Sequence, residues 1–372
     1  MVTLRLSEYL KKNGYEVIVY TPDLNSAKLE SHEYMPETAI MPDSSSCDTE
    51  NNIAYLAQQI KDRRIDLLII VWNTFLKFRN LRDNCPECRF MYIDHMQPFC
   101  ESIAKDERLK RRRTTPKGFL KWIAFDWIKF GMLGTHYSKW RKRTRILHDN
   151  TDAFVVLTPE YRREMIEALR ISDPHIHIIG NGVPLPTEVN TNKSKSVLWA
   201  GRLTYPDKRV DRLLRIWKRV EESCPEWNLT IAGDGEERQN LERQATELGL
   251  KHITFAGYQS DMPRLYSEAA ILCLTSTVDS WGLCLAEAQA NGVVPIAFDC
   301  SAGVRHILSD DSGILIKPFD EKAYAEALIA LIDDETRRKE LQQNAIRKSL
   351  DYNPEKIHRQ WLDLFRSLLS GK

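Results

Sequence analysis

The sequence lacks the features that mark membrane-spanning and secreted proteins. It has no run of 18 apolar residues and no leader with a short apolar core, so neither a transmembrane helix nor a secretory leader is expected. The 53 basic and 52 acidic residues leave a formal net charge of +1, which gives no general attraction to nucleic acid. These absences predict a cytoplasmic protein, with or without attachment to a membrane surface.

Cysteine is scarce as well. The eight cysteines are dispersed over 372 residues, so the chain is not a small disulfide-stabilised domain. Cys85 and Cys88 form one C-x-x-C pair, but no second pair and no pair of histidines follows at zinc spacing. An Asp-x-Asp metal motif is also absent. We interpret the pair as reduced thiols, with a metal or redox role as the lesser alternative, and expect no metal and no cofactor.

Predicted strands and helices alternate over the whole length of the chain. At 372 residues it is long for one hydrophobic core and natural for two. The apolar run at 66–72 is typical of a parallel strand buried on both faces. The prediction is an α/β fold with two doubly wound parallel-sheet domains that face a cleft. Other predicted strands lie at 16–21, 90–94, 153–158, 197–200, 229–232, 253–255, 270–274 and 294–298.

The domain boundary is predicted near residue 183. Small residues and prolines bounded by polar residues occupy 183–196, which is typical of a linker. Residues 1–182 are then an N-terminal domain, and 197–354 form a second domain. Residues 355–372 are expected to form a helix that packs back toward the first domain.

Two glycine turns follow strands at the same edge of the second predicted sheet. Gly201, Arg202 and Leu203 follow the first of these strands, with Lys208 just before a helix, and Gly233 follows the next strand. Glycine lets the backbone approach a ligand, and the two cations would lie where a helix N-terminus already favours an anion. Either turn alone is equally consistent with an ordinary strand–helix connection.

Two carboxylates follow the strand at 270–274. Asp279 lies in the loop, and Glu287 lies eight residues later in the helix that Gly282 opens. Backbone N–H groups near Gly282 and Leu283 are suited to phosphate oxygens, and carboxylates accept hydrogen bonds from sugar or ribose hydroxyls. On spacing alone, the alternative is two solvated acids beside a helix start.

From residue 197 to residue 318 the chain resembles the donor-binding domain of the retaining family-4 glycosyltransferases of GT-B fold. It has their Gly-Arg-Leu loop with Lys208, their Gly-Asp-Gly turn, their base-side loop ending at Tyr258 and their E-x7-E motif. The first acid of that motif is here Asp279, and Ser280 replaces the usual glycine. This departure puts the choice of donor sugar in doubt more than the activity.

A weaker resemblance extends over the N-terminal half, through the Asn181-Gly182-Val183 hinge and the loop that begins at Asp94 and His95. Within the family, the chain is most similar to bacterial transferases of lipopolysaccharide, capsule and exopolysaccharide assembly. The resemblance implies transfer of a hexosyl unit from a nucleotide sugar, expected to be UDP-linked, to a glycan or lipid-linked glycan. It also implies retention by front-face attack, with neither a metal ion nor an enzymic nucleophile.

The resemblance further implies a role for each matching residue. Arg202 and Lys208 neutralise the diphosphate, Glu287 holds the ribose, and backbone groups near Tyr258 hold the base. Asp279 contacts the donor sugar, and His95 reaches toward it from the N-terminal domain. His306 stands where many relatives have an acid, and no role is assigned to it. The remaining expected donor-binding positions are Gly201, Gly233, Gly282 and Leu283.

Other functions remain open at this point. A GT-B relative could be a sugar-nucleotide epimerase or a phosphorylase, although a phosphorylase needs a cofactor lysine site that the sequence does not reveal. A degenerate or truncated homologue would bind glycans or partners without turnover. Release of free nucleotide from a nucleotide sugar distinguishes these classes.

The segment 105–145 concentrates positive charge. It holds fourteen Lys or Arg residues and three Asp or Glu residues, together with several aromatic residues. A basic, aromatic helix too polar to span a bilayer is suited to the surface of an anionic membrane. The alternative is a helix with a solvated basic edge. Binding to nucleic acid is not favoured, because no nucleic-acid fold motif accompanies the patch.

The start of the chain looks incomplete. Residues 2–12 predict an amphipathic helix, whereas a doubly wound domain normally opens with a strand and a glycine-rich loop. We therefore expect Met1 to mark a misplaced start or a truncation. We also expect the first sheet to lack its central strand, and the chain to be poorly stable and weakly active.

Overall fold

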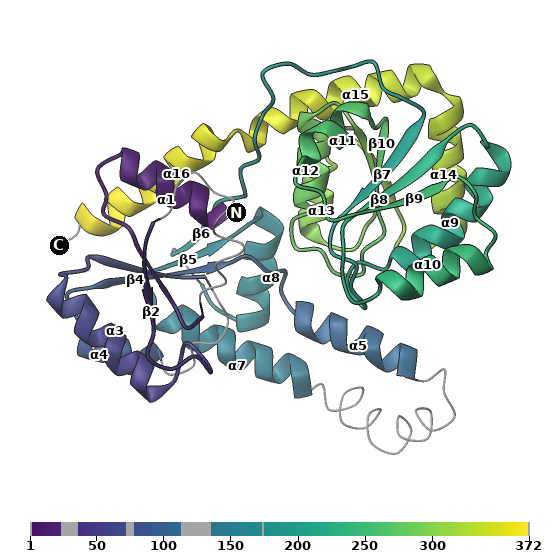
Figure 1. Cartoon of the computed structure of the whole chain (residues 1–372). Coiled ribbons are helices and arrows are strands. Elements are labelled where there is room, and N and C mark those ends of the chain that lie inside the picture. The colour runs from purple at the N-terminus through teal and green to yellow at the C-terminus, as the bar shows by residue number, and fades with distance from the viewer. Residues whose placement is uncertain (1, 24–35, 72–77, 113–134, 173–174, 371–372) are drawn as a thin grey trace. The chain divides into compact units, whose positions relative to one another are not determined.

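The computed structural model describes residues 2–23, 36–71, 78–112, 135–172 and 175–370, which form two compact units (Figure 1). The first unit comprises Met1–His95, Tyr137–Gly182 and Pro354–Lys372. The second comprises Met96–His136 and Val183–Asn353. Residues 96–136, which were expected in the first domain, therefore group with the second unit.

A four-stranded parallel sheet lies at the centre of the first unit, in the order β3-β4-β5-β6. The residues of β5 are all buried, whereas in β3, where the apolar run at 66–72 predicts burial on both faces, Ile70 is buried and the other three residues are partly exposed. A separate parallel sheet contains only β1 and β2. Among the described residues, the strands near residues 16 and 66 thus lie in separate sheets. The strands are β1 (Ile18–Thr21), β2 (Glu37–Ile40), β3 (Leu67–Ile70), β4 (Arg89–Asp94), β5 (Ala153–Val156) and β6 (Ile176–Ile178).

The first and last helices of the first unit share one hydrophobic cluster. Leu6 and Leu10 of α1 lie in it together with Trp361 and Phe365 of α16. Figure 1 shows α1 in purple beside α16 in yellow. The core of this unit therefore combines the two ends of the described chain. Its helices are α1 (Val2–Lys12), α3 (Glu50–Asp62), α4 (Phe78–Asn84), α7 (Thr135–Asp149), α8 (Pro159–Leu169) and α16 (Pro354–Ser370).

A six-stranded sheet lies at the centre of the second unit, in the order β12-β11-β10-β7-β8-β9. Each neighbouring pair of strands is parallel. The carboxyl ends of the strands therefore meet at one edge, which is where ligands bind in such sheets. The strands are β7 (Ser196–Ala200), β8 (Asn228–Ala232), β9 (Ile253–Gly257), β10 (Ile271–Leu274), β11 (Val294–Phe298) and β12 (Ile314–Ile316).

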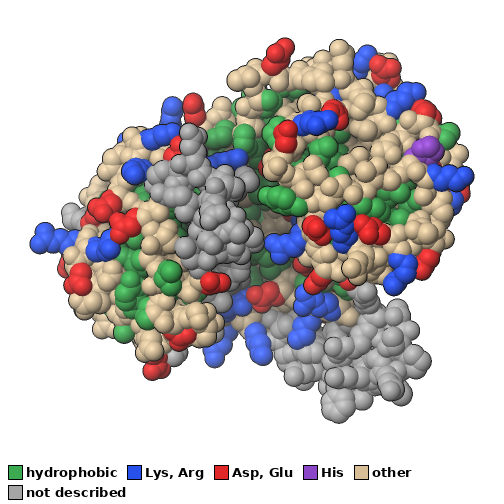
Figure 2. All heavy atoms as spheres, in the orientation of Figure 1, with side chains coloured by type: hydrophobic (Ala, Val, Ile, Leu, Met, Phe, Trp, Pro, Cys, Tyr) green, Lys and Arg blue, Asp and Glu red, His purple; other side chains and the backbone are tan. Residues whose placement is uncertain are grey.

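Helices connect these strands and cover the sheet. The apolar stripe of α9, which includes Leu213, Trp217 and Val220, is buried in the core of the unit. On the visible face of the second unit, Figure 2 shows basic and acidic side chains interspersed. The helices are α5 (Cys100–Arg112), α9 (Val210–Ser223), α10 (Arg238–Glu247), α11 (Met262–Glu268), α12 (Leu283–Ala290), α13 (Ala302–Ile307), α14 (Glu321–Asp333) and α15 (Glu335–Ser349).

Candidate functional site

The two predicted glycine turns interlock at the carboxyl edge of the second sheet. Gly201 N–H donates to the carbonyl oxygen of Ala232 over 3.0 Å, and Leu203 N–H donates to that of Asp234 over 2.9 Å. A Cβ atom on Gly233 would lie 1.8 Å from the carbonyl oxygen of Gly201. Because a side chain at position 233 would collide with this oxygen, glycine is required for the two turns to pack so closely.

Lys208 and Asp279, 71 residues apart, form an ion pair. Lys208 Nζ lies 2.6 Å from Asp279 Oδ2, and the lysine and aspartate side chains are 27% and 10% exposed. The other carboxylate oxygen, Oδ1, accepts a hydrogen bond from Gly282 N–H at 2.8 Å. Burial opposes the charge on Lys208, but the Asp279 carboxylate outweighs it, and the pKa of the lysine is raised. Lys208 therefore stays charged at neutral pH, and both oxygens of Asp279 are engaged.

Arg202 differs from Lys208, although both belong to the same loop. Its side chain is exposed, and it makes no hydrogen bond or ion pair with any residue that the structure describes. A guanidinium group offers several N–H donors that match phosphate oxygens. Arg202 is therefore the cation of this loop that is available to an anionic ligand.

The N-terminus of α12 offers two further donors beside Asp279. Gly282 has φ +78°, and a Cβ there would lie 2.8 Å from Leu285 Cδ1. The N–H groups of Leu283 and Cys284 make no hydrogen bond within the described parts of the chain, as is usual for the first turn of a helix. Such a terminus favours an anion. Burial raises the pKa of the Cys284 thiol to about 12, so the thiol adds no negative charge.

Glu287 is held in place by a tyrosine that the sequence did not single out. Tyr266 Oη donates to Glu287 Oε2 over 2.9 Å, and Tyr266 is only 2% exposed. Burial, and then the charge of Glu287, raise the pKa of Tyr266 far above its usual value, so the phenol remains a donor. No local pattern marks Tyr266, because its partner lies on another helix.

Tyr258 presents its ring to solvent. It is 79% exposed and follows Gly257, which has φ +71°. Arg238, also missed in the sequence, lies against this turn: its Nη1 is 3.0 Å from where a Cβ of Gly257 would be. The guanidinium group is held by Asp234 at 3.3 Å and Glu242 at 2.9 Å. An exposed ring beside a fixed cation is suited to a planar, polar ligand group.

The loop that carries Asp279 rests on the first turn of α13. Ser301 Oγ donates to the carbonyl oxygen of Asp279 over 2.6 Å and caps the helix by accepting from Val304 N–H. A Cβ on Gly303 would lie 2.0 Å from the carbonyl oxygen of Ser280. The Ser-Ala-Gly sequence at a helix start is a local sign of the cap, but it does not reveal the contact with the loop.

The second unit thus brings together the loops of nine expected site residues: Gly201, Arg202, Lys208, Gly233, Tyr258, Asp279, Gly282, Leu283 and Glu287. His95 belongs to the first unit, directly after β4, and burial lowers the pKa of its imidazole. In the segment 105–145, residues 113–134 lie outside the described residues. Cys85 and Cys88 are buried and form no disulfide among the described residues. In the described ranges, no three His, Cys, Asp or Glu side chains gather in a metal-binding group.

The sequence matches two family models that divide the chain between them. Residues 1–186 match the model described as Glycosyltransferase Family 4. Residues 186–348 match the model described as Glycosyl transferases group 1. The boundary between the two matches, at residue 186, lies close to residue 183, where the chain leaves the first unit for the second.

Two relatives are each similar over 60% of this chain. The amylovoran biosynthesis glycosyltransferase AmsD of Erwinia amylovora is 30% identical over 60% of this chain and 65% of its own length. An α-1,4-N-acetyl-D-galactosaminyltransferase of Campylobacter jejuni, whose name includes a PP-undecaprenol-linked glycan, is 29% identical over 60% of this chain and 63% of its own length. The matched part therefore spans less than two thirds of either relative.

The fold is similar to that of HepE from Anabaena, which was solved in complex with UDP and glucose. The TM-score is 0.72 at 16% identity, over 98% of this chain and 95% of that chain. The predicted fold class, with two Rossmann-like parallel sheets of GT-B type, is confirmed. Because the first family model covers half of the sequence, the chain belongs to glycosyltransferase family 4.

Proposed function

We propose that the protein is a retaining glycosyltransferase that moves a hexosyl unit from a UDP-linked sugar to a glycan or lipid-linked glycan in cell-surface polysaccharide synthesis. The observation that carries the proposal is the pair of cations on the loop after β7. Lys208 is held by Asp279, whereas Arg202 is exposed and unpaired among the described residues. Beside them, α12 presents unbonded N–H groups. This combination suits a diphosphate.

In the proposed reaction, the acceptor hydroxyl oxygen forms a bond to the anomeric carbon while the bond from that carbon to the phosphate oxygen breaks. Retention is proposed to follow from front-face attack, with the acceptor proton passing to the leaving diphosphate. Arg202, Lys208 and the N-terminus of α12 stabilise the negative charge that develops on the leaving group. A preorganised donor of this kind typically contributes about 3–4 kcal/mol to the transition state.

Each remaining residue has a proposed place along the donor. Glu287, fixed by Tyr266, accepts hydrogen bonds from the ribose hydroxyls. The exposed ring of Tyr258 lies along the base. Asp279 acts mainly by holding Lys208 and Gly282 in place, since both of its oxygens are engaged. His95 is proposed to act on the donor sugar from the first unit.

The proposed stabilisation of the leaving group relies on cationic side chains and backbone N–H groups, and we propose that it requires no metal ion. Adding a chelator to the assay tests this proposal. Unchanged turnover supports it, and a loss of turnover that magnesium or manganese restores contradicts it.

The central experiment is a screen of nucleotide sugars for nucleotide release, with and without a lipid-linked glycan acceptor. Release that requires the acceptor supports a transferase. Formation of a different nucleotide sugar without acceptor indicates an epimerase. Binding without release under all conditions indicates a homologue that does not turn over. In calorimetric titration with UDP, Glu287→Ala is expected to weaken affinity about tenfold, because it removes a charged hydrogen-bond partner; unchanged affinity contradicts the ribose role.

Attachment to an anionic membrane surface is proposed for the segment 105–145. The support is its excess of basic residues and its aromatic content, which suit the headgroup region of a bilayer. No helix in the described ranges is long and apolar enough to cross a membrane. A lipid-linked acceptor would be reached from such a surface.

A further inference from the structure

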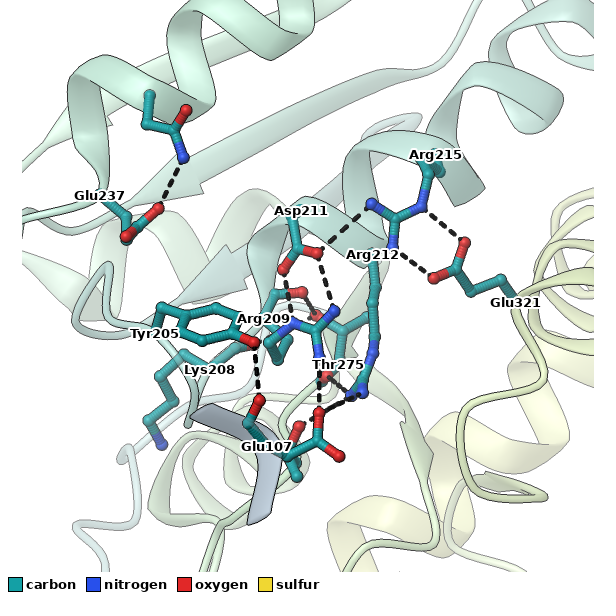
Figure 3. A network of polar contacts seen from close by, with 12 residues as sticks. Glu107, Tyr205, Lys208, Arg209, Asp211, Arg212, Arg215, Glu237, Thr275 and Glu321 are labelled. Atoms are coloured by element: carbon teal, nitrogen blue, oxygen red, sulfur yellow. Dashed lines mark hydrogen bonds and ion pairs between the residues drawn. The ribbon is translucent and has the colours of Figure 1, made fainter. Parts of the chain in front are cut away.

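The segment that begins at Met96 contacts both loops that carry the ionic part of the candidate site. At its start, Gln97 N–H donates to Ser280 Oγ over 2.9 Å, next to Asp279. Ten residues later, in α5, Glu107 Oε2 accepts from Arg209 Nη1 over 3.0 Å, next to Lys208. Tyr205 Oη also donates to the carbonyl oxygen of Glu107 over 3.1 Å. Figure 3 shows Glu107 with Tyr205 and Arg209 around it.

Glu107 is the carboxylate that balances two buried arginines. The Glu107 and Arg212 side chains are each 6% exposed, with Arg212 Nη2 3.6 Å from Glu107 Oε2, and Arg209 is 13% exposed. Among the described residues, Arg212 otherwise contacts Thr275, Thr277 and the face of Phe319. Glu107 is thus the only carboxylate in ion-pair contact with Arg212 in that part of the chain, and Asp211 and Glu321 act on Arg212 from farther away. A buried guanidinium group that loses its anion is strongly disfavoured.

The backbone beside Arg209 sets the direction of Lys208. Arg209 has φ +49°, a left-handed conformation that is uncommon for a residue with a side chain. Its guanidinium group is held by Asp211 at 2.8 Å on one side and by Glu107 on the other. Thr275 Oγ1 donates to the carbonyl oxygens of Lys208 and Arg209. The position of Lys208 therefore depends on how Arg209 is held.

A cavity of about 570 Å³ adjoins these ion pairs, lined in part by Tyr205, Arg209, Gln244 and Phe319. The two arginines therefore do not lie in a closely packed interior on that side. Once the carboxylate is removed, Arg209 keeps Asp211 as its ion-pair partner among the described residues, and the cavity leaves both arginines space to change rotamer.

We infer that Glu107 is a positioning residue for the donor diphosphate: by holding Arg209 and Arg212 it fixes α5 against the loop after β7 and against α9, and it keeps Lys208 directed at Asp279. Glu107 itself does not contact the donor. This inference rests on the proposed function, because it concerns affinity for the nucleotide.

The test is calorimetric titration of the full chain with UDP. Glu107→Gln keeps the shape of the side chain and removes the charge, and we expect UDP affinity to fall about tenfold. Glu107→Asp, which keeps the charge, should recover part of the loss. The matched control is Glu101→Gln, an exposed glutamate on the same helix, for which no change is expected.

A double-mutant cycle with Lys208→Ala separates positioning from a loss of stability. If Glu107 acts through Lys208, adding Glu107→Gln to Lys208→Ala changes UDP affinity little. Independent, additive effects overturn the inference, as does unchanged affinity in Glu107→Gln when the wild type binds UDP. Failure of the wild type to bind UDP or GDP at all instead contradicts the proposed function, and the inference with it.

A second readout does not depend on the nucleotide. Hydrogen exchange of the unliganded chain should show faster exchange in 203–212 and 275–282 for Glu107→Gln, while 238–247 stays unchanged. If all three segments exchange at the same rate in Glu107→Gln as in the wild type, the positioning role is contradicted.

Discussion

At the scale of single residues, the two cations of the loop after β7 are held in different ways. Asp279 forms an ion pair with Lys208, whereas the Arg202 side chain is exposed and makes no ion pair with the described residues. A bound diphosphate would therefore compete with Asp279 for Lys208, whereas Arg202 would form a new ion pair with it. The two side chains should therefore differ in what their loss does.

We expect Arg202→Ala and Lys208→Ala each to reduce turnover at least about 100-fold, because each acts on charge that develops at the leaving diphosphate. Lys208→Ala should also lower stability, since it leaves the Asp279 carboxylate without its ion-pair partner, whereas Arg202→Ala should not. Steady-state kinetics and thermal melting measure the two effects. Near-normal kcat in both variants would falsify the role of this loop.

Lys193 gives a prediction about pH. Its Nζ donates to the backbone carbonyl oxygens of Tyr266, Ser267 and Asn291 at 2.9, 3.1 and 2.8 Å. Burial lowers its pKa to about 8, compared with about 10.4 in an unfolded chain. Between these values the unfolded state binds a proton that the folded state has released, so this group favours folding increasingly as pH rises.

The free energy of unfolding of the wild type should thus rise relative to Lys193→Met from pH 8 to pH 10, by at most about 3 kcal/mol. Below about pH 7.5 the difference should be flat, since both states are then protonated. Urea unfolding at several pH values measures it. A difference that stays constant across the whole range contradicts the lowered pKa.

At the scale of elements, the crossing of the two glycine turns is the tightest point of the candidate site. Gly233→Ala would place a Cβ 1.8 Å from a backbone oxygen, which only a backbone shift relieves. We expect a loss of about 1–3 kcal/mol in stability and at least tenfold weaker UDP binding.

The matched control for this change is Gly249→Ala. Gly249 also has a positive φ, +67°, but no atom lies within 4 Å of its added Cβ. Gly249→Ala therefore has the conformational cost, about 1 kcal/mol, but not the clash. Its UDP affinity should be normal. Equal behaviour of the two variants would show that the crossing is not constrained.

The sequence predicts local features of these elements well and tertiary contacts poorly. Thr158 caps α8 with Pro159 at its first position, and the Thr-Pro-Glu sequence marks this cap because a cap depends on neighbouring residues alone. The expectation that Asp279 contacts the donor sugar stays a prediction, but the sequence does not reveal that its oxygens contact Lys208, 71 residues away, and Gly282 N–H. Tyr266 and Arg238 were missed for the same reason. Their significance comes from partners that the fold brings near.

The same distinction holds for larger features: those with a local sequence pattern are predicted, and those that depend on tertiary contacts are not. Alternating apolar runs were sufficient to predict two parallel-sheet units, since burial on both faces leaves a clear pattern. The membership of residues 96–136 in the second unit has no such pattern, because a helix of mixed polarity such as α5 fits either side. Glu107 shows why: as a buried acid paired with Arg209 and Arg212, it reads locally as one more surface charge.

At the scale of the whole molecule, the proposed membrane attachment is open to a direct test. Replacing Arg111, Arg112 and Arg113 by serine removes three basic residues, each worth about 1 kcal/mol near an anionic surface. We expect the variant to leave phosphatidylserine liposomes at low salt in a sedimentation assay. A wild type that does not sediment with these liposomes would contradict the proposal.

The control is a triple variant of equal charge change on the second unit: Arg243, Lys251 and Arg264, which are exposed, each replaced by serine. If this variant also leaves the liposomes, the attraction depends on total charge and not on the segment 105–145.

The sharing of one hydrophobic cluster by α1 and α16 has a consequence for the order in which the protein takes shape on the ribosome. Leu6 and Leu10 precede the second unit in the chain, whereas Trp361 and Phe365 follow it. At roughly 5–20 residues per second, tens of seconds separate them. The strands and connecting helices of the second unit all emerge within that interval. The unit that starts to be synthesised first is therefore the one that is completed last.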